Sequence, residues 1–270
     1  MGKRIGLISS VGQGAIAKVS SFHTMILLLY DMIVALIVRR QKSVPIKQLT
    51  NQILFIGVDA LVLTLSIALV ISIMMTFFSF ENMDDFGASS KYGIFMVISM
   101  ILELGPFVTA IVVVGRSGAA FTTFLANMKV TREIDALDSM GIDVVEYLVL
   151  PALLGMIFSL VALNFYFDMI ALLGGVFFAK VYYGVSFTIY FRQIIDALNF
   201  SDIPLSMIKS TLFGVVIAVV SSYHGLVVSN LRIVPRAVYR SSVTSTSLIL
   251  LINILISVVY YGIRSKLNGH

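Results

Sequence analysis

Residues 103–151 read ELGPFVTAIVVVGRSGAAFTTFLANMKVTREIDALDSMGIDVVEYLVLP. An apolar run follows the single acid Glu103, a charged segment extends from Lys129 to Asp143, and a second apolar run begins after Glu146. A helix that crosses a bilayer needs about 20 predominantly apolar residues. The stretch therefore predicts two membrane-crossing helices joined by a charged segment in water.

The composition extends this prediction to the whole chain. Of the 270 residues, 59% are apolar and 12% are charged, whereas soluble domains average about 45–50% and about 25%. So little charge excludes a soluble enzyme, a disordered chain and a coiled coil. Cysteine is absent and the three histidines lie far apart, so we expect no disulfide and no metal site. The net charge of +5 suits loops that face anionic lipid, and no basic stretch is interleaved with aromatic residues as nucleic-acid binding would require.

Five long apolar segments favour an all-α integral membrane protein with a single domain. Strands of a membrane β-barrel would be about ten residues long and would alternate, and these segments do neither. The expected membrane helices are 54–80, 92–125, 147–179, 204–230 and 243–264. Asp168 closes an unbroken apolar run, and with the small pair Ala171 and Gly175 it is expected to mark the outer end of its helix and a packing turn.

A sixth apolar stretch, 22–38, is shorter and contains Asp31. It either crosses the membrane or lies in the interface as an amphipathic helix. If it lies on the cytoplasmic side, twelve Lys and Arg face the cytoplasm and six, Lys209 among them, face the other side; if it crosses, nine face each side. Because cytoplasmic loops are enriched in Lys and Arg, the interfacial placement is favoured.

The quoted stretch closely resembles the MlaE-type ABC permease family, whose members are membrane subunits that move phospholipids alongside MCE-domain proteins. Three places depart from the family pattern. Leu102 stands where Arg often precedes the Glu, Phe124-Leu125-Ala126 stands where Glu-Leu-Gly often precedes the Met, and Val144 stands where Pro follows the Asp. Residues 230–246 diverge as well. The motifs that match are Glu103–Pro106, Gly115–Ala120, Met128–Thr131, Ile134–Leu137, Met140–Asp143 and Pro151.

The resemblance implies a permease subunit in the bacterial inner membrane, paired with a second copy of itself, a separate ATPase subunit that uses ATP, and an MCE-domain protein on the outer side. Phospholipid is the implied substrate, while its exact identity and the direction of transport stay open. The chain contains no G-x-x-x-x-G-K-[ST] motif, which ATP hydrolysis of the P-loop kind requires. We therefore expect no enzymatic activity and no cofactor of its own.

The charged segment has the pattern of a short amphipathic helix, with apolar residues at helical spacing beside acids. Such a helix between two spans suits a groove on another protein, although an ordinary solvated helix has the same pattern. By resemblance, residues 128–143 form the coupling helix that contacts the ATPase. The expected contact residues are Met128, Glu133, Ile134, Asp135, Leu137, Met140 and Gly141.

Glu103 lies about 10 residues into its span, or about 15 Å by helical rise. A carboxylate at that depth is costly and indicates a functional site, and Pro106 should kink or break the helix. By resemblance Glu103 lies near the phospholipid cavity at the dimer centre; a hydrogen-bonded structural Glu is the alternative. A Met and Phe group at the end of the first span suits an acyl chain or plain packing. The expected cavity residues are Glu103, Pro106, Met75, Phe78, Met83 and Phe86.

Small residues around one arginine predict close helix packing; they are Gly115, Arg116, Gly118 and Ala119. The main alternative function is a proton- or ion-coupled secondary transporter that uses Glu103, and an intramembrane enzyme is a third. Against a proton relay, the same span offers only Arg116, and Asp59 and Asp168 are expected near opposite ends of other spans.

Overall fold

The computed structural model describes residues 22–35, 46–83, 97–198 and 201–267. Within these ranges the chain is helical and has no β-strand. Five helices are long and apolar enough to cross a membrane, which confirms the predicted fold class. They are Leu49–Glu81, Ile98–Val130, Val145–Tyr183, Asp202–Leu226 and Leu231–Arg264.

The first two spans change their helical pitch along their length. In the first, α2 (Ile46–Ile53) continues through the π-helical turn η1 (Leu54–Val58) into α3 (Asp59–Met83). The second has four parts, which are η3 (Val97–Leu104, π), α5 (Gly105–Val113), η4 (Val114–Gly118, π) and α6 (Ala119–Val130).

Pro106 lies in the first turn of α5, directly after η3. The predicted break is wrong, because the span stays one helix from Ile98 to Val130. A proline lacks the backbone N–H of the i→i−4 ladder, and a π turn is a common way to accommodate a local disturbance of that ladder. At Pro106 the helix therefore continues with a change of pitch from π to α.

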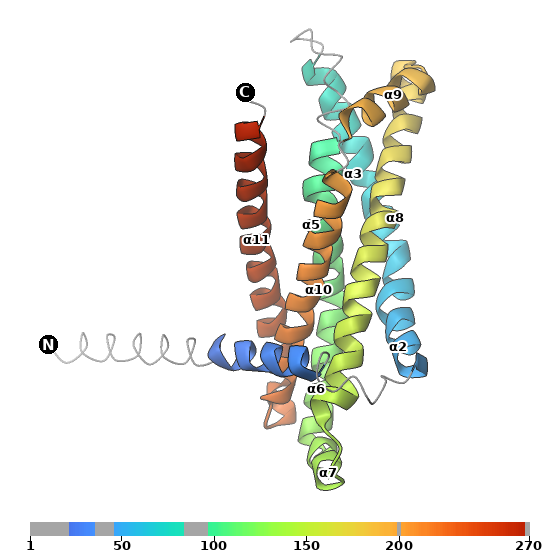
Figure 1. The fold of residues 1–270 in the computed structure, drawn as a ribbon. Coiled ribbons are helices and arrows are strands. Elements are labelled where there is room, and N and C mark those ends of the chain that lie inside the picture. Colours follow the sequence, from blue (N-terminus) through green and yellow to red (C-terminus); the bar gives the residue numbers. More distant parts are fainter. Residues whose placement is uncertain (1–21, 36–45, 84–96, 199–200, 268–270) are drawn as a thin grey trace, which may run out of the picture.

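The third span, η5 (Val145–Val149) followed by α8 (Leu150–Tyr183), is the centre of the bundle and packs against α3, α5 and α10 (Figure 1). Asp168 lies well inside α8, so the prediction that it marks the helix end is wrong. Because Asn164 donates a hydrogen bond to its carboxylate one turn away, the acid is accommodated without ending the helix.

The fourth span is α10 (Asp202–Leu226), which follows the short α9 (Phe187–Ala197) and begins two residues before the expected range 204–230. It approaches its neighbours closely at glycines. A Cβ on Gly214 would lie 2.9 Å from Ile157 Cα, and one on Gly225 would lie 2.7 Å from Leu125 Cβ. Close approach at small residues is how membrane helices gain packing energy.

The last span, η6 (Leu231–Ile233) with α11 (Val234–Leu267), stands beside the bundle and separates from it toward the C-terminus (Figure 1). Only 11% of its apolar window is buried, against 67% for the third span. Most of the side chains of α11 therefore face outward from this chain.

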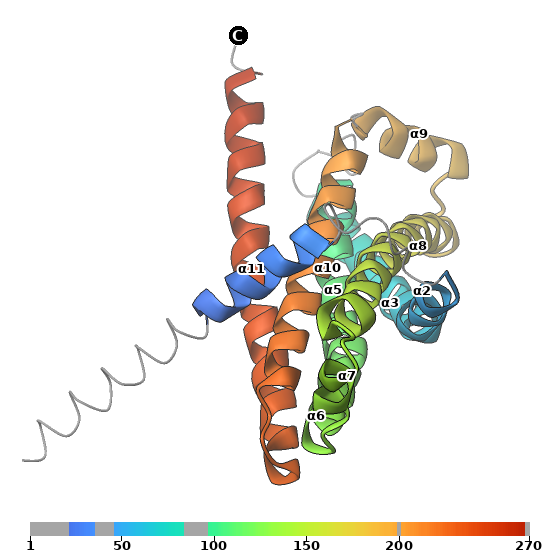
Figure 2. The same ribbon diagram turned by 60° about the horizontal axis from the view of Figure 1, so that its bottom comes forward.

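The N-terminal helix, Phe22–Ala35, lies across the bundle axis (Figures 1 and 2). Met25 and Met32 are buried against the bundle core, whereas Phe22 and Tyr30 are more than half exposed. The described part of this helix is about 21 Å long by helical rise. Its placement agrees with the interfacial prediction; residues 36–38 of the predicted range lie outside the described residues.

The segment between the second and third spans is not one helix. α6 ends at Val130, Arg132 adopts a left-handed conformation with φ 63°, and α7 occupies only Glu133–Ser139. Gly141 then turns the chain with φ 72°. The predicted helix over 128–143 is therefore too long, because two residues with positive φ interrupt it. The resulting hairpin projects from the end of the bundle (Figure 1).

Candidate functional site

A buried ion pair joins the second and fourth spans. Nζ of Lys209, on α10, lies 3.2 Å from Oε2 of Glu103, on η3; the lysine side chain is fully buried and the glutamate side chain is 28% exposed. Nζ also donates to the Leu102 carbonyl at 2.8 Å and to Ser257 Oγ at 2.8 Å. All three ammonium protons thus have acceptors, which a buried charge requires to be tolerated.

The last span completes this site. Ser257 Oγ donates to Glu103 Oε1 at 2.8 Å, and Asn253 Nδ2 donates to Oε2 at 3.2 Å. The two residues are four positions apart and so share one face of α11. Glu103, Lys209, Asn253 and Ser257, here named the polar cluster, therefore tie a mostly exposed helix to the second and fourth spans.

Sequence reasoning misplaces Lys209. It counts Lys209 among the charges on the outer side, at the start of the expected helix 204–230, but α10 begins at Asp202 and carries Lys209 two turns into the helix, where its side chain is fully buried. The argument against a relay also needs correction, since Glu103 does have a titratable neighbour from another span. One signal was present: Lys209 is the only Lys or Arg within 204–230, as Glu103 is the only acid within 92–125.

A second polar contact joins α10 and α11 nearer the C-terminal end of α11. Tyr260 Oη donates to Asp202 Oδ1 at 2.6 Å, and an Arg264 guanidinium nitrogen lies 3.8 Å from the same oxygen. Asp202 is fully buried. α11 is therefore fastened to α10 by polar groups at two levels.

The other predicted cavity residues have different surroundings. Pro106 is buried, Met75 packs against the apolar cluster around Phe167, and Phe78 is 56% exposed. Met83 is the last residue of α3, its side chain is not described, and Phe86 lies outside the described residues. The two described members of the Met and Phe group thus face different environments.

The apolar stripe of α7 points mostly inward. Ile134 is buried and Leu137 is half-buried, and both pack in the core of this chain, as does Met128. The prediction that Ile134 faces a partner is therefore wrong, because α7 folds back onto α6 and buries it. Leu137 keeps part of its surface exposed, and its contact with a partner stays a prediction. Met140 is 66% exposed and Gly141 is exposed, which leaves these two of the stripe open to a partner.

The acids of α7 remain on the outside. Glu133 and Asp135 are exposed, and Lys129 Nζ donates to Asp135 Oδ1 at 2.8 Å. This hydrogen bond, together with the charge of Lys129, lowers the pKa of Asp135 below its ordinary value. The hairpin tip therefore presents exposed acidic side chains around Met140.

Arg116 joins the second span to the first. Its guanidinium is 2.8 Å from Asp59 Oδ2 and lies 6.0 Å from the ring centroid of Phe55. The small residues beside Arg116 differ in how closely other helices approach them. A Cβ on Gly118 would lie 3.1 Å from Ile217 Cγ2, whereas one on Gly115 would meet no atom within 4 Å, and Ala119 is half-buried. Only the Gly118 side packs within this chain as predicted.

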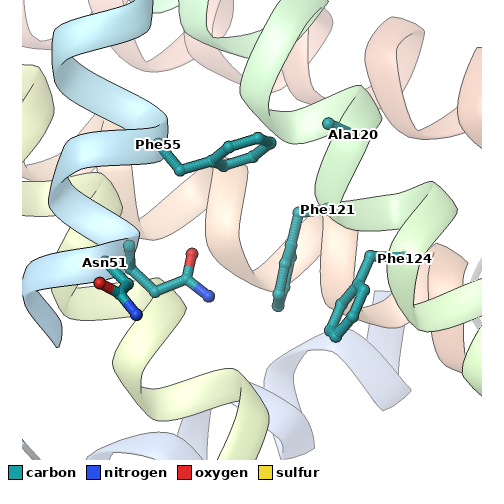
Figure 3. A pocket seen from close by; sticks show the side chains of 6 residues that line it. Asn51, Phe55, Ala120, Phe121 and Phe124 are labelled. Carbon is teal, nitrogen blue, oxygen red and sulfur yellow. The ribbon is translucent and has the colours of Figure 1, made fainter. Parts of the chain in front are cut away.

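Phe55 also lines a cavity of about 280 Å³ between the first and second spans. Figure 3 shows Phe55 and Phe121 facing this space from the two helices, with Phe124 beside them. No residue of this cavity was selected from the sequence. Its lining is Asn51, Gln52, Phe55, Ala120, Phe121 and Phe124.

In the part of the chain that the structure describes, no group of three or more His, Asp or Glu side chains could hold a metal ion. The charged clusters are ion pairs and hydrogen-bonded groups. They can fix helices to one another and can present a charge to a ligand inside an apolar bundle.

Comparison with known proteins identifies the family. A probable ABC transporter permease protein of Rickettsia typhi is 29% identical over 214 residues, which are 79% of this chain and 83% of the relative. One of Rickettsia felis is 26% identical over 96% of this chain and 99% of its own length. One of Porphyra purpurea is 30% identical over 73% and 75%. The family described as Permease MlaE matches residues 49–259. Because this match covers the first four spans, the hairpin with α7 and most of the fifth span, the chain belongs to the MlaE permease family.

Proposed function

We propose that this chain is the membrane-spanning permease subunit of an ABC transporter that moves phospholipids or related lipids, in the bacterial inner membrane. The observation that carries the proposal is the polar cluster, in which a fully buried lysine pairs with Glu103 between three membrane helices. A headgroup needs a charged contact, and acyl chains need apolar surroundings. An intramembrane ionisable group is a functional site by default.

In this proposal Lys209 supplies the positive charge that attracts the headgroup phosphate. The family resemblance places an Arg at position 102, where this chain has Leu102; Lys209 Nζ lies 2.8 Å from the carbonyl of that residue. Because Lys209 is fully buried, a phosphate reaches it only when Ser257 and Asn253 withdraw. Lipid entry would therefore be coupled to a movement of α11.

The energy comes from a separate ATPase. The hairpin with α7 projects from the bundle end, and exposed Met140 with the acids Glu133 and Asp135 offers it a contact. Two copies of this chain around a two-fold axis would match two ATPase subunits, and the outward face of α11 would face the second copy. An MCE-domain protein would receive or deliver lipid on the opposite side.

A second candidate function is a proton-coupled secondary transporter, because the Glu103–Lys209 pair consists of two titratable groups inside the membrane region. A relay needs a chain of titratable groups toward each side. Tyr261 interacts with Glu103, whereas the other side-chain partners of the pair, Asn253 and Ser257, do not titrate. A lipid needs only one polar point on an apolar path. The polar cluster therefore favours lipid over protons.

Photocrosslinking tests the lipid path. A photoreactive amino acid at position 254, next to Asn253 and exposed, should capture phospholipid in membranes, and capture should fall when Lys209→Met removes the charge. A photoreactive residue at Val181, exposed at the far end of α8, is the control for bulk lipid. Capture at 254 that equals the control and ignores Lys209→Met would contradict the proposal.

A further inference from the structure

A cavity of about 600 Å³ lies between α8 and α10. Its walls are mostly apolar, including Phe158 and Phe165 from α8 and Met207 from α10. A volume of this size falls within the range of about 300–1,000 Å³ found for small-molecule sites. We name it the α8–α10 groove.

The α8–α10 groove contains a buried group of polar side chains, Asn164, Asp168 and Ser206. Asn164 Nδ2 donates to Ser206 Oγ at 2.7 Å and to Asp168 Oδ2 at 3.4 Å. Oδ1 of Asn164 and Oδ1 of Asp168 are buried and have no hydrogen-bond partner. No Lys, Arg or His lines the groove, so this group has more acceptors than donors.

Gly105 explains how the two acceptor oxygens fit. A Cβ at this position would overlap Asp168 Oδ1 and would lie 2.9 Å from Asn164 Oδ1. The unpartnered oxygens therefore rest against the glycine, and Asp168 Oδ2 holds only the long bond from Asn164. Because the two unpartnered oxygens are buried there, an occupant's N–H or O–H would donate to Asp168 Oδ2, whose bond from Asn164 is 3.4 Å long.

The length of the groove indicates which kind of molecule it binds. From Ile157 to Leu172 the groove runs about 22 Å along α8 by helical rise. From Ile157 to Asp168 the distance is about 16 Å, close to one leaflet of a core about 30 Å thick. An alkyl chain that extends through one leaflet therefore matches the groove in length, and the apolar walls suit it.

We propose that the α8–α10 groove binds the alkyl chain of a membrane amphiphile whose hydroxyl or amine donates a hydrogen bond to Asp168. The site is separate from the polar cluster: Gly105 meets α8, whereas Glu103 meets α10 and α11. The inference therefore does not depend on the proposed function, and either one can fail alone.

Three matched probes test the donor. Photoreactive hexadecanol, hexadecylamine and hexadecyl methyl ether, each with the same mid-chain diazirine, are added to the purified protein in phosphatidylcholine nanodiscs. We expect the alcohol or the amine to label peptides within 157–172 about five- to tenfold more than the ether, as one hydrogen bond would give. Preference for the amine over the alcohol assigns an ion pair with Asp168, and equal labelling by both assigns a neutral hydrogen bond. Equal labelling by all three probes overturns the proposal.

Two variants locate the binding. Asp168→Leu should reduce labelling by the alcohol and the amine to the level of the ether. Ala162→Phe, at an exposed groove position, should fill the groove and reduce labelling by all three probes. Val181→Phe, exposed on the same helix outside the groove, is the control. If Asp168→Leu does not fold, Ala162→Phe still decides, and labelling that survives it unchanged overturns the proposal.

Discussion

Replacing Lys209 with methionine leaves the Glu103 carboxylate without its cation. Opposite charges 3.2 Å apart attract by about 5 kcal/mol at an effective dielectric constant of about 20, and removing one partner of a buried pair costs about 3–5 kcal/mol. Glu103 is 28% exposed, so water recovers part of this loss. We expect Lys209→Met to lower the free energy of unfolding by about 2–3 kcal/mol.

Unfolding in detergent micelles, followed by helical circular dichroism across a denaturant series, measures this loss. Lys180→Met, at an exposed position of α8, is the matched control and should change stability by less than about 0.5 kcal/mol. Adding Glu103→Gln to Lys209→Met removes the orphaned charge and should restore at least half of the loss, by about 1–2 kcal/mol. The reasoning is refuted if Lys209→Met is as stable as Lys180→Met, or if the double variant is less stable than Lys209→Met.

Further predictions concern three other positions. Gly105→Ala should destabilise the fold by more than about 1 kcal/mol because its Cβ overlaps Asp168, whereas Gly115→Ala meets nothing and should be neutral by the same unfolding assay. Met140→Glu should reduce co-purification of the ATPase with stability unchanged, while Ile134→Glu should destabilise the chain itself, since Ile134 is buried and Met140 is not; equal effects of the two would contradict the inward packing of α7. Lys129→Met should raise the pKa of Asp135 toward its ordinary value of 3.8, as read by carboxyl NMR titration. Because the folded pKa is depressed, the pair stabilises the hairpin at neutral pH, and this contribution disappears as the pH falls through the folded pKa.

The apolar segments predict the five spans because length and charge suffice to identify a membrane helix. What they do not predict is where charges are tolerated within a span. Asp168 interrupts the apolar run but not the helix. Asn164 donates a hydrogen bond to its carboxylate, and Gly105, which has no side chain, leaves room for Oδ1. Lys209 resembles a loop residue by its place near the start of a span, and only its contact with Glu103 from another helix reveals that it is buried.

The amphipathic pattern of α7 illustrates a different limit. Ile134, Leu137 and Met140 form one apolar stripe in the sequence. The periodicity indicates that the stripe packs against another surface, but it does not indicate whether that surface belongs to this chain or to a partner. The structure divides it, because α7 is only two turns long and returns at Gly141. Ile134 is covered by this chain, Leu137 is partly covered, and Met140 is left for a partner.

Transport in proteoliposomes tests the central claim most directly. The chain is reconstituted with its co-purified ATPase, and movement of a fluorescent phospholipid out of the vesicles is followed with ATP and no proton gradient, then with a proton gradient and no ATP. The account predicts transport that requires ATP, falls at least severalfold in Lys209→Met and persists in Lys180→Met. Transport that follows the proton gradient without ATP would contradict it.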